Sequence, residues 1–568
     1  MNEDFRKSAP APLAPVAFNI SQPFETTLSN GLKLVIFEDR KLPLVSFRLF
    51  LRAGDIHEPS DSVGINSATA SMLSEGTEGY SSKQLAEEIE RLGAGLSAGS
   101  GSDTTSISAS SLTLYASDIL RLMAEMILKP TFPEEELDLY RRNTIEGLKF
   151  QRSQASFLAD EQVSRIIFGA HPYSKVSPKA VDIEKITREK LVEYQAKRFI
   201  PNNAVLIVVG DVETDVIISE IEDKLGEWQA GKIDDFAYSS VPERTGRTLT
   251  IVDRKGSAQA NIVIANPAIE RNHPDYFPVI LMNQILGAGA SSRIFMNLRE
   301  EKGYTYGAYS KLDTRRLAGV FEATAEVRTS VTGDSLKEFF YEFNRIRESK
   351  VSEQELEDAK NFLTGVFPIR AETQEGLTSL IVQQKIYNLP DDYLQTYRDN
   401  INTVTIEDVE MAAQKYVQPE TMAIVIVGDA EDILPQVKEY ASSVEIFDTD
   451  GNAQDISNYG KSVESPAIDL SGNWKLEVDF QGQQIPVSLN LEQTEGTISG
   501  KLESMLGEGK IANGKVSGNS FSAVAVTEMS GQQLELSISG SVEKELMKGV
   551  LSASMIPMPL DFTGQREK

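Results

Sequence analysis

The sequence predicts a protein of the α+β class, built from two duplicated α/β domains and a small all-β domain of the barrel or sandwich type. Three observations support this. Helical and strand periodicities alternate through the first part of the chain, a helix–turn–strand segment occurs twice, and the C-terminal part consists of short runs with the period of two that marks strands. The length of 568 residues is enough for three or four domains, since one domain takes about 100 to 200 residues.

The first predicted domain, residues 20–235, alternates strands and helices. Two β-rich runs lead into an alanine-rich helix, and a second helix carries Leu85, Ile89 and Leu92 at helical spacing, with Gly93 placed to end it. The expected elements are, in order, strands at 24–40 and 43–54, helices at 64–77 and 81–92, a strand at 103–115, helices at 115–128 and 132–154, and a strand at Ala204–Val212.

A segment at the end of this domain has a copy further along the chain. Thr187–Asp211 matches Thr405–Asp429 at one constant offset, with Pro201 aligned to Pro419. Chance does not reproduce a whole helix, turn and strand in this way. The sequence therefore predicts a second, homologous domain at residues 245–445.

The C-terminal part has a different character. Residues 446–469 lose periodicity and are rich in Asp, Asn, Ser and Gly, which predicts a linker. Residues 470–568 contain short alternating runs, in which Leu534, Leu536 and Ile538 share one face, separated by turn residues. This pattern is typical of a small antiparallel barrel or sandwich. Nothing in it names a ligand, so both an interaction or spacer module and a small binding barrel remain open.

Composition excludes several classes of function. The net charge of −28 argues against nucleic acid as a partner, because phosphate binding needs a basic surface. No cysteine is present, so neither disulfides nor cysteine metal sites are possible. His57, His171 and His273 are scattered singly, and we expect them on the surface or in turns. No apolar run reaches the roughly 18 residues of a transmembrane helix.

Residues 1–19 form a predicted N-terminal extension without the apolar core of a signal peptide. Their Pro/Ala spacing is typical of a mature protein that begins just after a processed signal or lipidation site. We therefore expect a periplasmic or cell-envelope protein whose signal sequence is absent here, with a cytoplasmic location as the alternative.

Residues Gly64–Thr77 have the sequence pattern of a zinc-protease helix but lack its zinc ligands and its general base. In the inverted zincin pattern H-x-x-E-H, two histidines one turn apart hold zinc and the Glu serves as general base. Here the histidine positions carry Ser67 and Ser71, and the base position carries Ala70. A neutral hydroxyl is a poor zinc ligand, and alanine cannot take a proton from water. We therefore expect no metal or other cofactor in this chain.

A second motif lies in the second predicted domain. The run SSRIFMNLREEKG predicts a helix that ends at Gly303 with a left-handed cap, and TYGAYS predicts the strand that follows. This places the guanidinium of Arg299 at the helix end and the phenol of Tyr306 at the strand start. Such donors can bind substrate carbonyls and stabilise an oxyanion. In the alternative interpretation, Arg299 pairs with a nearby acid such as Glu300 or Asp313, and Tyr306 packs at a strand edge.

Together with the duplication and the triplet His171-Pro172-Tyr173, these two motifs resemble the pitrilysin/insulysin family of inverted-zincin metallopeptidases. The likeness is to the short form related to mitochondrial processing peptidase, and it covers residues 20–445. It implies two pitrilysin-like half-shell domains that enclose a chamber. It also implies a zinc site on an active subunit, completed by an Arg and a Tyr from another domain.

The resemblance also assigns positions in this chain. The family's Arg/Tyr pattern is intact from Arg299 through Gly303 to Tyr306. The family's third zinc ligand, a Glu, falls near Glu146 or Gly147. The spacing favours Gly147, which leaves Glu146 as an exposed helix acid, and a shift of one residue reverses this.

Two functions follow from the resemblance. In the first, the chain is the non-catalytic subunit of a heterodimeric zinc peptidase and supplies Arg299 and Tyr306 to the zinc site of a homologous partner that bears H-x-x-E-H. Peptide is then the substrate, and the isolated chain is expected to form a homodimer. In the second, the chain is an inert scaffold or peptide-binding protein, like the core subunits of ubiquinol cytochrome c reductase. A self-sufficient protease would need zinc ligands that the sequence does not offer.

Overall fold

The computed structural model describes residues 20–459, 468–480, 483–494, 496–504, 507–517, 519–529, 532–553 and 560–567. The predicted extension at 1–19 lies outside these residues. The chain divides into two compact units, residues 1–460 and 461–568. None of the described helices is both long and apolar enough to cross a membrane.

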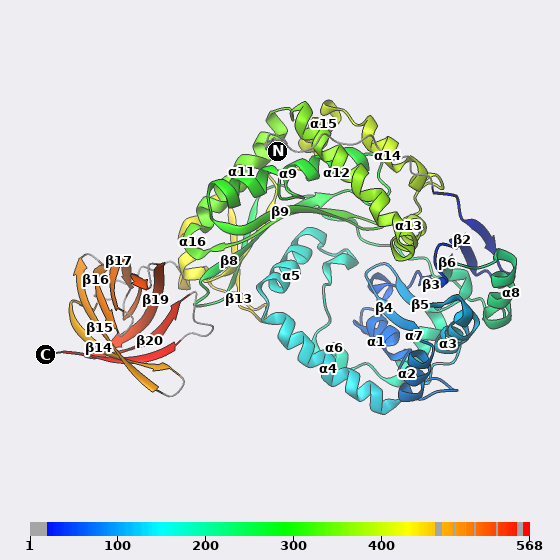
Figure 1. Ribbon diagram of the computed structural model, residues 1–568, viewed down its shortest axis with the longest axis horizontal. Helices are drawn as coiled ribbons and strands as arrows, with labels where there is room; N and C mark the ends of the chain where they lie inside the picture. Colours follow the sequence, from blue (N-terminus) through cyan, green and yellow to red (C-terminus); the bar gives the residue numbers. More distant parts are fainter. Residues whose placement is uncertain are drawn as a thin grey trace, which may run out of the picture. The chain divides into compact units, whose positions relative to one another are not determined.

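The first unit contains two sheets, and the first of them has six strands (Figure 1). Its order is β1 (Phe24–Thr27), β2 (Lys33–Glu38), β6 (Ala204–Gly210), β3 (Leu44–Leu51), β5 (Thr105–Leu112) and β4 (Gly95–Ser100). The associated helices are α1 (Ile65–Met72), α2 (Ser82–Arg91), α3 (Ala116–Leu128), α4 (Glu134–Arg152), α5 (Ala155–Phe168), α6 (Ala180–Glu184), α7 (Arg188–Arg198) and α8 (Thr214–Leu225).

The second sheet has seven strands. Its order is β13 (Ala453–Gln454), β12 (Ser443–Phe447), β7 (Thr248–Asp253), β11 (Ala423–Gly428), β8 (Gln259–Ala268), β10 (Gly319–Arg328) and β9 (Thr305–Thr314). Its helices are α9 (Tyr276–Leu286), α10 (Arg293–Phe295), the π-helix η6 (Met296–Glu301), α11 (Thr332–Glu348), α12 (Glu353–Glu372), α13 (Gln374–Ile386), α14 (Tyr393–Thr403), α15 (Ile406–Tyr416) and α16 (Ala430–Val437).

The same five-strand arrangement occurs in both sheets. The orders β2-β6-β3-β5-β4 and β7-β11-β8-β10-β9 correspond strand for strand. In each, the first pair is parallel and the other three pairs are antiparallel. The strands β6 and β11 are paired on both sides, which explains their nearly continuous apolar sequences, AVLIVVG and AIVIVG. They are the strands of the repeated sequence segment.

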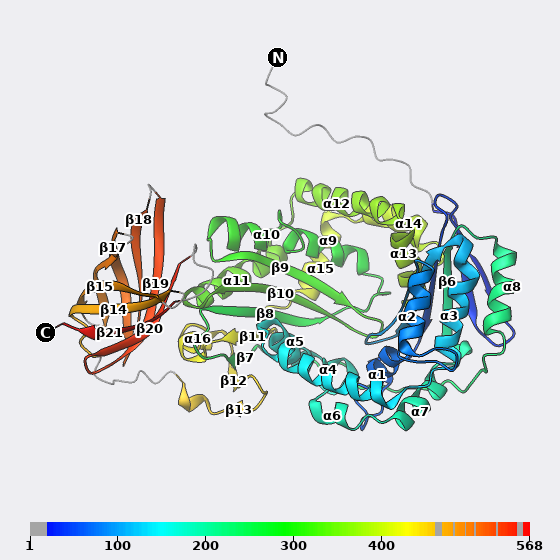
Figure 2. The ribbon, with the colours of Figure 1, turned by 60° about the horizontal axis from the view of Figure 1, so that its bottom comes forward.

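One helix from each half of the first unit packs on the sheet of the other half (Figures 1 and 2). Helix α5 lies against β8 and β11, where Val163 and Ile167 join Val263 and Val425 in one buried cluster. In the same way, α13 lies against β3 and β6 and buries Ile381 with residues of the first sheet. The two halves therefore share two buried hydrophobic clusters, each with residues from both halves.

The structure corrects two expectations about the chain's elements. The predicted linker does not begin at Ile446, because β12 and β13 pair along the edge of the second sheet and bury Ile446. The strand expected at Ala204–Val212 ends at Gly210, where φ is +150° and a side chain would collide with the backbone of β3. Strand β4, which the sequence did not predict, has the small, weakly apolar sequence GLSAGS.

The second unit is a closed antiparallel barrel, which decides between the two predicted architectures. Its interior is filled by apolar side chains, including Trp474, Leu536 and Ile538, whereas Ser537 and Ser539 face outward. Leu534 lies where the structure does not describe side chains. The strands are β14 (Gly472–Phe480), β15 (Gln483–Thr494), β16 (Thr497–Ser504), β17 (Gly507–Ser517), β18 (Ser520–Met529), β19 (Gln532–Glu543), β20 (Leu546–Ala553) and β21 (Leu560–Arg566).

Candidate functional site

Helix α1, which carries the altered zinc motif, is held in place at its N-terminus. Gly64 adopts φ +88°, a conformation that favours glycine, and its N–H donates to Glu58 over 3.0 Å. The N–H of Asn66 donates to the same carboxylate over 2.9 Å, and its side chain donates to Asp55. Burial raises the pKa of Glu58 to about 7, although these N–H donors oppose the shift. The helix thus has an ordered start that needs no metal ion.

The three motif positions of α1 offer no zinc chemistry. Ser67 is half-buried, Ala70 is buried and Ser71 is exposed. Ser67 forms a hydrogen bond with Tyr140 of α4, whose pKa is raised mainly by burial. Hydroxyl and methyl groups do not replace two imidazoles and a carboxylate. Within the described residues, no group of three His, Cys, Asp or Glu side chains is arranged to hold a metal ion.

Both candidates for the third-ligand position lie on the exposed side of α4. Glu146 forms an ion pair with Lys149 over 2.7 Å, and both side chains are largely exposed. A Cβ added to Gly147 would meet nothing within 4 Å. Glu146 is an exposed helix acid, as the sequence predicted. The residues at these positions therefore do not fit a zinc site, whichever of the two matches the family's ligand.

The second motif folds as a helix with a π-helical turn. The N–H of Lys302 donates to the carbonyl of Asn297, five residues earlier, over 3.0 Å. Gly303 then takes φ +63°, the left-handed cap that the sequence predicted. Isolated π turns occur frequently at functional sites. Arg299 lies in this turn with its side chain 45% exposed, 3.4 Å from Glu300, and its guanidinium lies 4.8 Å from the centre of the Phe295 ring.

Tyr306 projects from an irregular strand start. The register between β9 and β10 shifts between Ala325 and Val327, so β9 has a bulge beside Tyr306. Thr305 fixes this bulge, because its hydroxyl donates to Glu326 O over 2.6 Å and accepts from Gly307 N over 3.1 Å. A bulge bends the strand locally and thereby changes the direction in which its side chains point. Tyr306 is 90% exposed, which differs from the alternative in which it packs at a strand edge.

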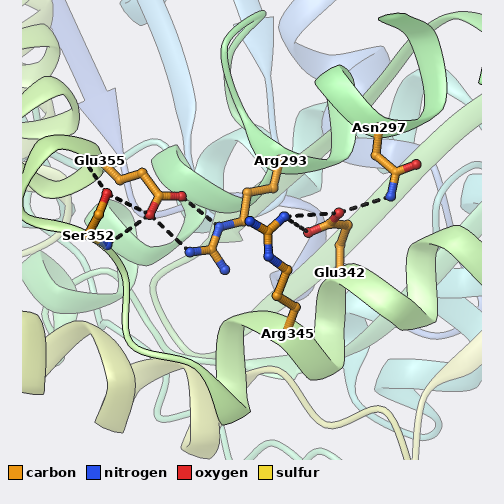
Figure 3. Close-up of polar contacts among 6 residues, drawn as sticks. All are labelled: Arg293, Asn297, Glu342, Arg345, Ser352 and Glu355. Atoms are coloured by element: carbon orange, nitrogen blue, oxygen red, sulfur yellow. Dashed lines mark hydrogen bonds and ion pairs between the residues drawn. The ribbon is translucent and has the colours of Figure 1, made fainter. Parts of the chain in front are cut away.

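A partly buried ionic cluster anchors the helix that carries Arg299 (Figure 3). Arg293 donates two hydrogen bonds to Glu355 of α12, at 2.8 and 3.1 Å. The same carboxylate accepts from the N–H and hydroxyl of Ser352, closing the capping box of α12. Burial alone would raise the pKa of Glu355, but the bonds from Arg293 and Ser352 outweigh it and lower the pKa to about 2. The start of the Arg299 helix is thereby tied to α12.

A second set of contacts ties the same helix to α11 (Figure 3). Asn297 donates to Glu342 over 2.9 Å and to Glu338 over 3.1 Å. Glu342 is 2% exposed and also pairs with Arg345 at 3.3 Å. A buried carboxylate is stable only when it is paired or hydrogen-bonded. The helix that carries Arg299 is therefore held by side-chain contacts to both α11 and α12.

Sequence reasoning missed this anchoring cluster. The S-x-x-E spacing of Ser352 and Glu355 signals a helix start, but it does not reveal that Arg293, from a distant segment, shares the carboxylate. The histidines were also misjudged in part. His57 and His171 lie in turns as expected, but they are buried rather than on the surface.

Two models of one protein family match consecutive parts of the chain. Residues 34–176 match the family described as insulinase, peptidase family M16, and residues 185–363 match the domain described as peptidase M16 inactive domain. The chain belongs to peptidase family M16. Together the two matches span more than half of the sequence, and neither reaches residues 461–568.

Three proteins similar to this M16 chain are distant from it in sequence. The chain is 22% identical to an "uncharacterized zinc protease YmxG" of Bacillus subtilis, over 70% of this chain and 97% of that protein. It is also 22% identical to a "non-peptidase homolog YmxG" of Helicobacter pylori, over 70% of this chain and 91% of that protein. A crystal structure titled as a peptidase M16 inactive domain from Pseudomonas fluorescens aligns with a TM-score of 0.67 and 28% identity, covering 72% of this chain and 98% of that one.

Proposed function

We propose that this M16 protein is the non-catalytic subunit of a heterodimeric zinc peptidase. It supplies Arg299 and Tyr306 to the zinc site of a homologous partner that carries H-x-x-E-H, and the substrate is a peptide. The observation that carries the proposal is a contrast between the motifs. The two ligand positions hold Ser67 and Ser71 and the base position holds Ala70. Tyr306, by contrast, is 90% exposed at a bulge fixed by hydrogen bonds.

The chemistry assigned to this chain is binding and charge stabilisation. A phenol O–H and a guanidinium placed near a scissile carbonyl orient it and stabilise the oxyanion that forms on attack by water. Zinc in the partner supplies the activated water. The firm anchoring of the Arg299 helix by Glu355 and Glu342 supports this role, because donors stabilise an oxyanion best when they need no rearrangement.

The repeated strand order supports a duplicated pair of half-shell domains. In our proposal these form half of the proteolytic chamber, and the partner forms the other half. The chain alone forms a homodimer and prefers the heterodimer. We place the complex in the periplasm or cell envelope, and we assign the barrel an interaction or spacer role.

An inert scaffold or peptide-binding protein is the second candidate, and one observation favours it. Arg299 already contacts Glu300 and the ring of Phe295, so its guanidinium has partners within its own helix. The H. pylori relative is likewise named a non-peptidase homolog.

One experiment separates these functions. The chain, the H-x-x-E-H homologue from the same source and their mixture are each assayed for zinc content and for peptide hydrolysis. We expect no stoichiometric zinc and no cleavage from this chain alone, and much faster cleavage by the mixture than by the homologue. One tightly bound zinc ion per chain in this protein would refute the proposal. Equal activity of the homologue with and without this chain would favour the scaffold.

A further inference from the structure

A small basic pocket lies in the first unit, and its lining includes no residue of either motif. It has a volume of about 220 Å³ and is lined by residues from three parts of the chain. Arg52 follows β3, His57 and Arg198 also come from the first half, and Lys232 belongs to the connecting segment. Arg316 reaches it from the turn between β9 and β10.

The pocket is positively charged in a strongly acidic protein. Arg52, Lys197, Arg198, Lys232 and Arg316 line it, against only two carboxylates from neighbouring Asp residues. The chain as a whole has a net charge of −28. Lys197 and Arg198 share Asp234, and Nε of Arg316 lies 3.7 Å from Asp103. The five cations still outnumber the carboxylates near them, and this arrangement suits an anionic occupant.

The acids of the pocket do not neutralise every cation. Asp234 pairs with Lys197 at 3.3 Å and with Arg198 at 3.2 Å. Among the described residues, the Arg52 side chain donates one hydrogen bond, to the amide oxygen of Asn388 over 3.2 Å. Burial lowers the pKa of Arg52, and the positive charge of Arg316 lowers it further. Arg52 therefore faces a like charge without a carboxylate of its own among the described residues.

One buried donor in the pocket also lacks a partner. Nε of Arg198, a residue 8% exposed, makes no hydrogen bond. Buried donors are almost always paired in folded proteins. The pKa of His57 is lowered to about 4 by burial and by the charge of Arg316, so the imidazole is neutral near pH 7. An anion in the pocket would accept a hydrogen bond from the Nε–H of Arg198.

We propose that this pocket binds a small oxyanion, either inorganic phosphate or a terminal carboxylate, through Arg52, Arg198 and Arg316. Guanidinium groups bind both anions by charge-assisted hydrogen bonds. The pocket joins both halves of the first unit to the segment that connects them, so the bound anion holds these parts together. Neither Arg299 nor Tyr306 lines it, and the inference does not depend on the proposed function.

Calorimetric titration of the full chain tests this, with phosphate added at constant ionic strength against chloride. A second arm uses trialanine with a free C-terminus against its amidated form, which distinguishes the two sources of oxyanion. We expect saturable binding of phosphate, of the free carboxylate, or of both, and a rise in melting temperature with the bound anion. Arg52→Gln should weaken binding at least about tenfold, because one charge-assisted donor is lost.

Lys232→Gln is the second variant, since this exposed side chain can be changed without disturbing a core, and it should weaken binding several-fold. Lys83→Gln, at an exposed lysine outside the pocket, is the matched control and should bind as the wild type does. No saturable binding of either anion by the wild type would overturn the proposal. So would wild-type affinity in both pocket variants.

Discussion

Arg299 and Tyr306 differ in how many contacts their side chains make with the rest of the protein. The guanidinium of Arg299 has Glu300 and the Phe295 ring as neighbours, so it must exchange contacts to bind a substrate. Tyr306 is 90% exposed and leaves its phenol accessible. A large exposed aromatic on a bulge fixed by Thr305 is not needed for packing in this chain. Tyr306 is therefore the residue that tests the proposed chemistry best.

Replacing Tyr306 by Phe removes one donor and keeps the ring. We expect kcat of the heterodimer to fall by about 10² to 10³, the loss seen when one oxyanion donor is removed. Arg299→Ala should raise KM at least as much as it lowers kcat, because a carbonyl-binding guanidinium also acts in the ground state. Steady-state kinetics measure both effects, with complex formation checked by light scattering.

The matched control for Tyr306 is Tyr341→Phe, at a tyrosine that is 55% exposed on α11. It should leave turnover unchanged. If Tyr306→Phe and Arg299→Ala both assemble and cleave at the wild-type rate, the pair has no catalytic role and the scaffold function is preferred.

The carboxylate of Glu355 should make stability depend on acid pH. Its pKa is lowered to about 2 in the folded state, against 4.5 for the ordinary side chain. The unfolded chain then binds more protons between these values, so stability is complete above pH 4.5 and is lost as pH falls toward 2. Since the side chain is partly exposed, we expect a loss of about 1–2 kcal/mol rather than the full shift.

Glu355→Gln should flatten this part of the curve in urea unfolding between pH 6 and pH 3. Glu357→Gln, at an exposed position of the same helix, is the control and should keep the wild-type slope. An unchanged slope in Glu355→Gln would show that the bonds from Arg293 and Ser352 do not hold this carboxylate ionised.

At the scale of elements, helices α5 and α13 each pack on the sheet of the other half, so the two halves share buried cores. Each helix follows a long helix of its own half and then packs on the other sheet. Ile167 of α5 and Ile381 of α13 are fully buried in these crossed contacts. A cavity at either position therefore weakens a core that both halves share.

We expect Ile167→Ala and Ile381→Ala each to destabilise the protein by about 2–5 kcal/mol, the usual cost of such a truncation in a core. Both should shift the same unfolding transition, because each side chain bridges two halves. Denaturant titration followed by circular dichroism measures this, with Ser156→Ala at an exposed position of α5 as the control. Two variants that shift two different transitions would contradict the shared core.

At the scale of the whole molecule, the chain consists of two units with separate cores. Residues 1–460 contain both sheets, and residues 461–568 contain the closed barrel. The barrel core is made only of residues from Ile468 onward, and Trp474 is fully buried in it. Its first and last strands, β14 and β21, pair with each other, so no edge strand is left to be covered by another unit.

The full chain should therefore show two calorimetric transitions, and the fragment 461–568 should reproduce one of them. A barrel with a filled apolar core and paired edges needs no support from the first unit. Differential scanning calorimetry of the full chain and of the fragment checks this. An unfolded fragment, or a single transition that moves when Ile167 is replaced by Ala, would show that the two units depend on each other.

Much of the fold could be predicted because its signals are local. The apolar runs of β6 and β11, the helical spacing of α2 and the cap at Gly303 each depend on a few neighbouring residues. The loss of zinc ligands could likewise be predicted, since donor chemistry belongs to the side chains Ser67 and Ser71 themselves. By contrast, β4 was missed because small polar residues give no periodic signal.

The sequence by itself determined the family, the repeated segment, the helices and strands with a clear periodicity, and which motif had lost its chemistry. Only the tertiary structure decided that α5 and α13 exchange sheets, that β12 extends the second sheet past Ile446, and that Arg293 shares the carboxylate of Glu355. It also decided that Tyr306 is exposed and that Arg52 and Arg316 line one basic pocket. The physical reason is the separation along the sequence of the residues that interact. Periodicity and donor chemistry are properties of neighbouring residues, whereas packing and charge pairing depend on residues that meet only after the chain has folded.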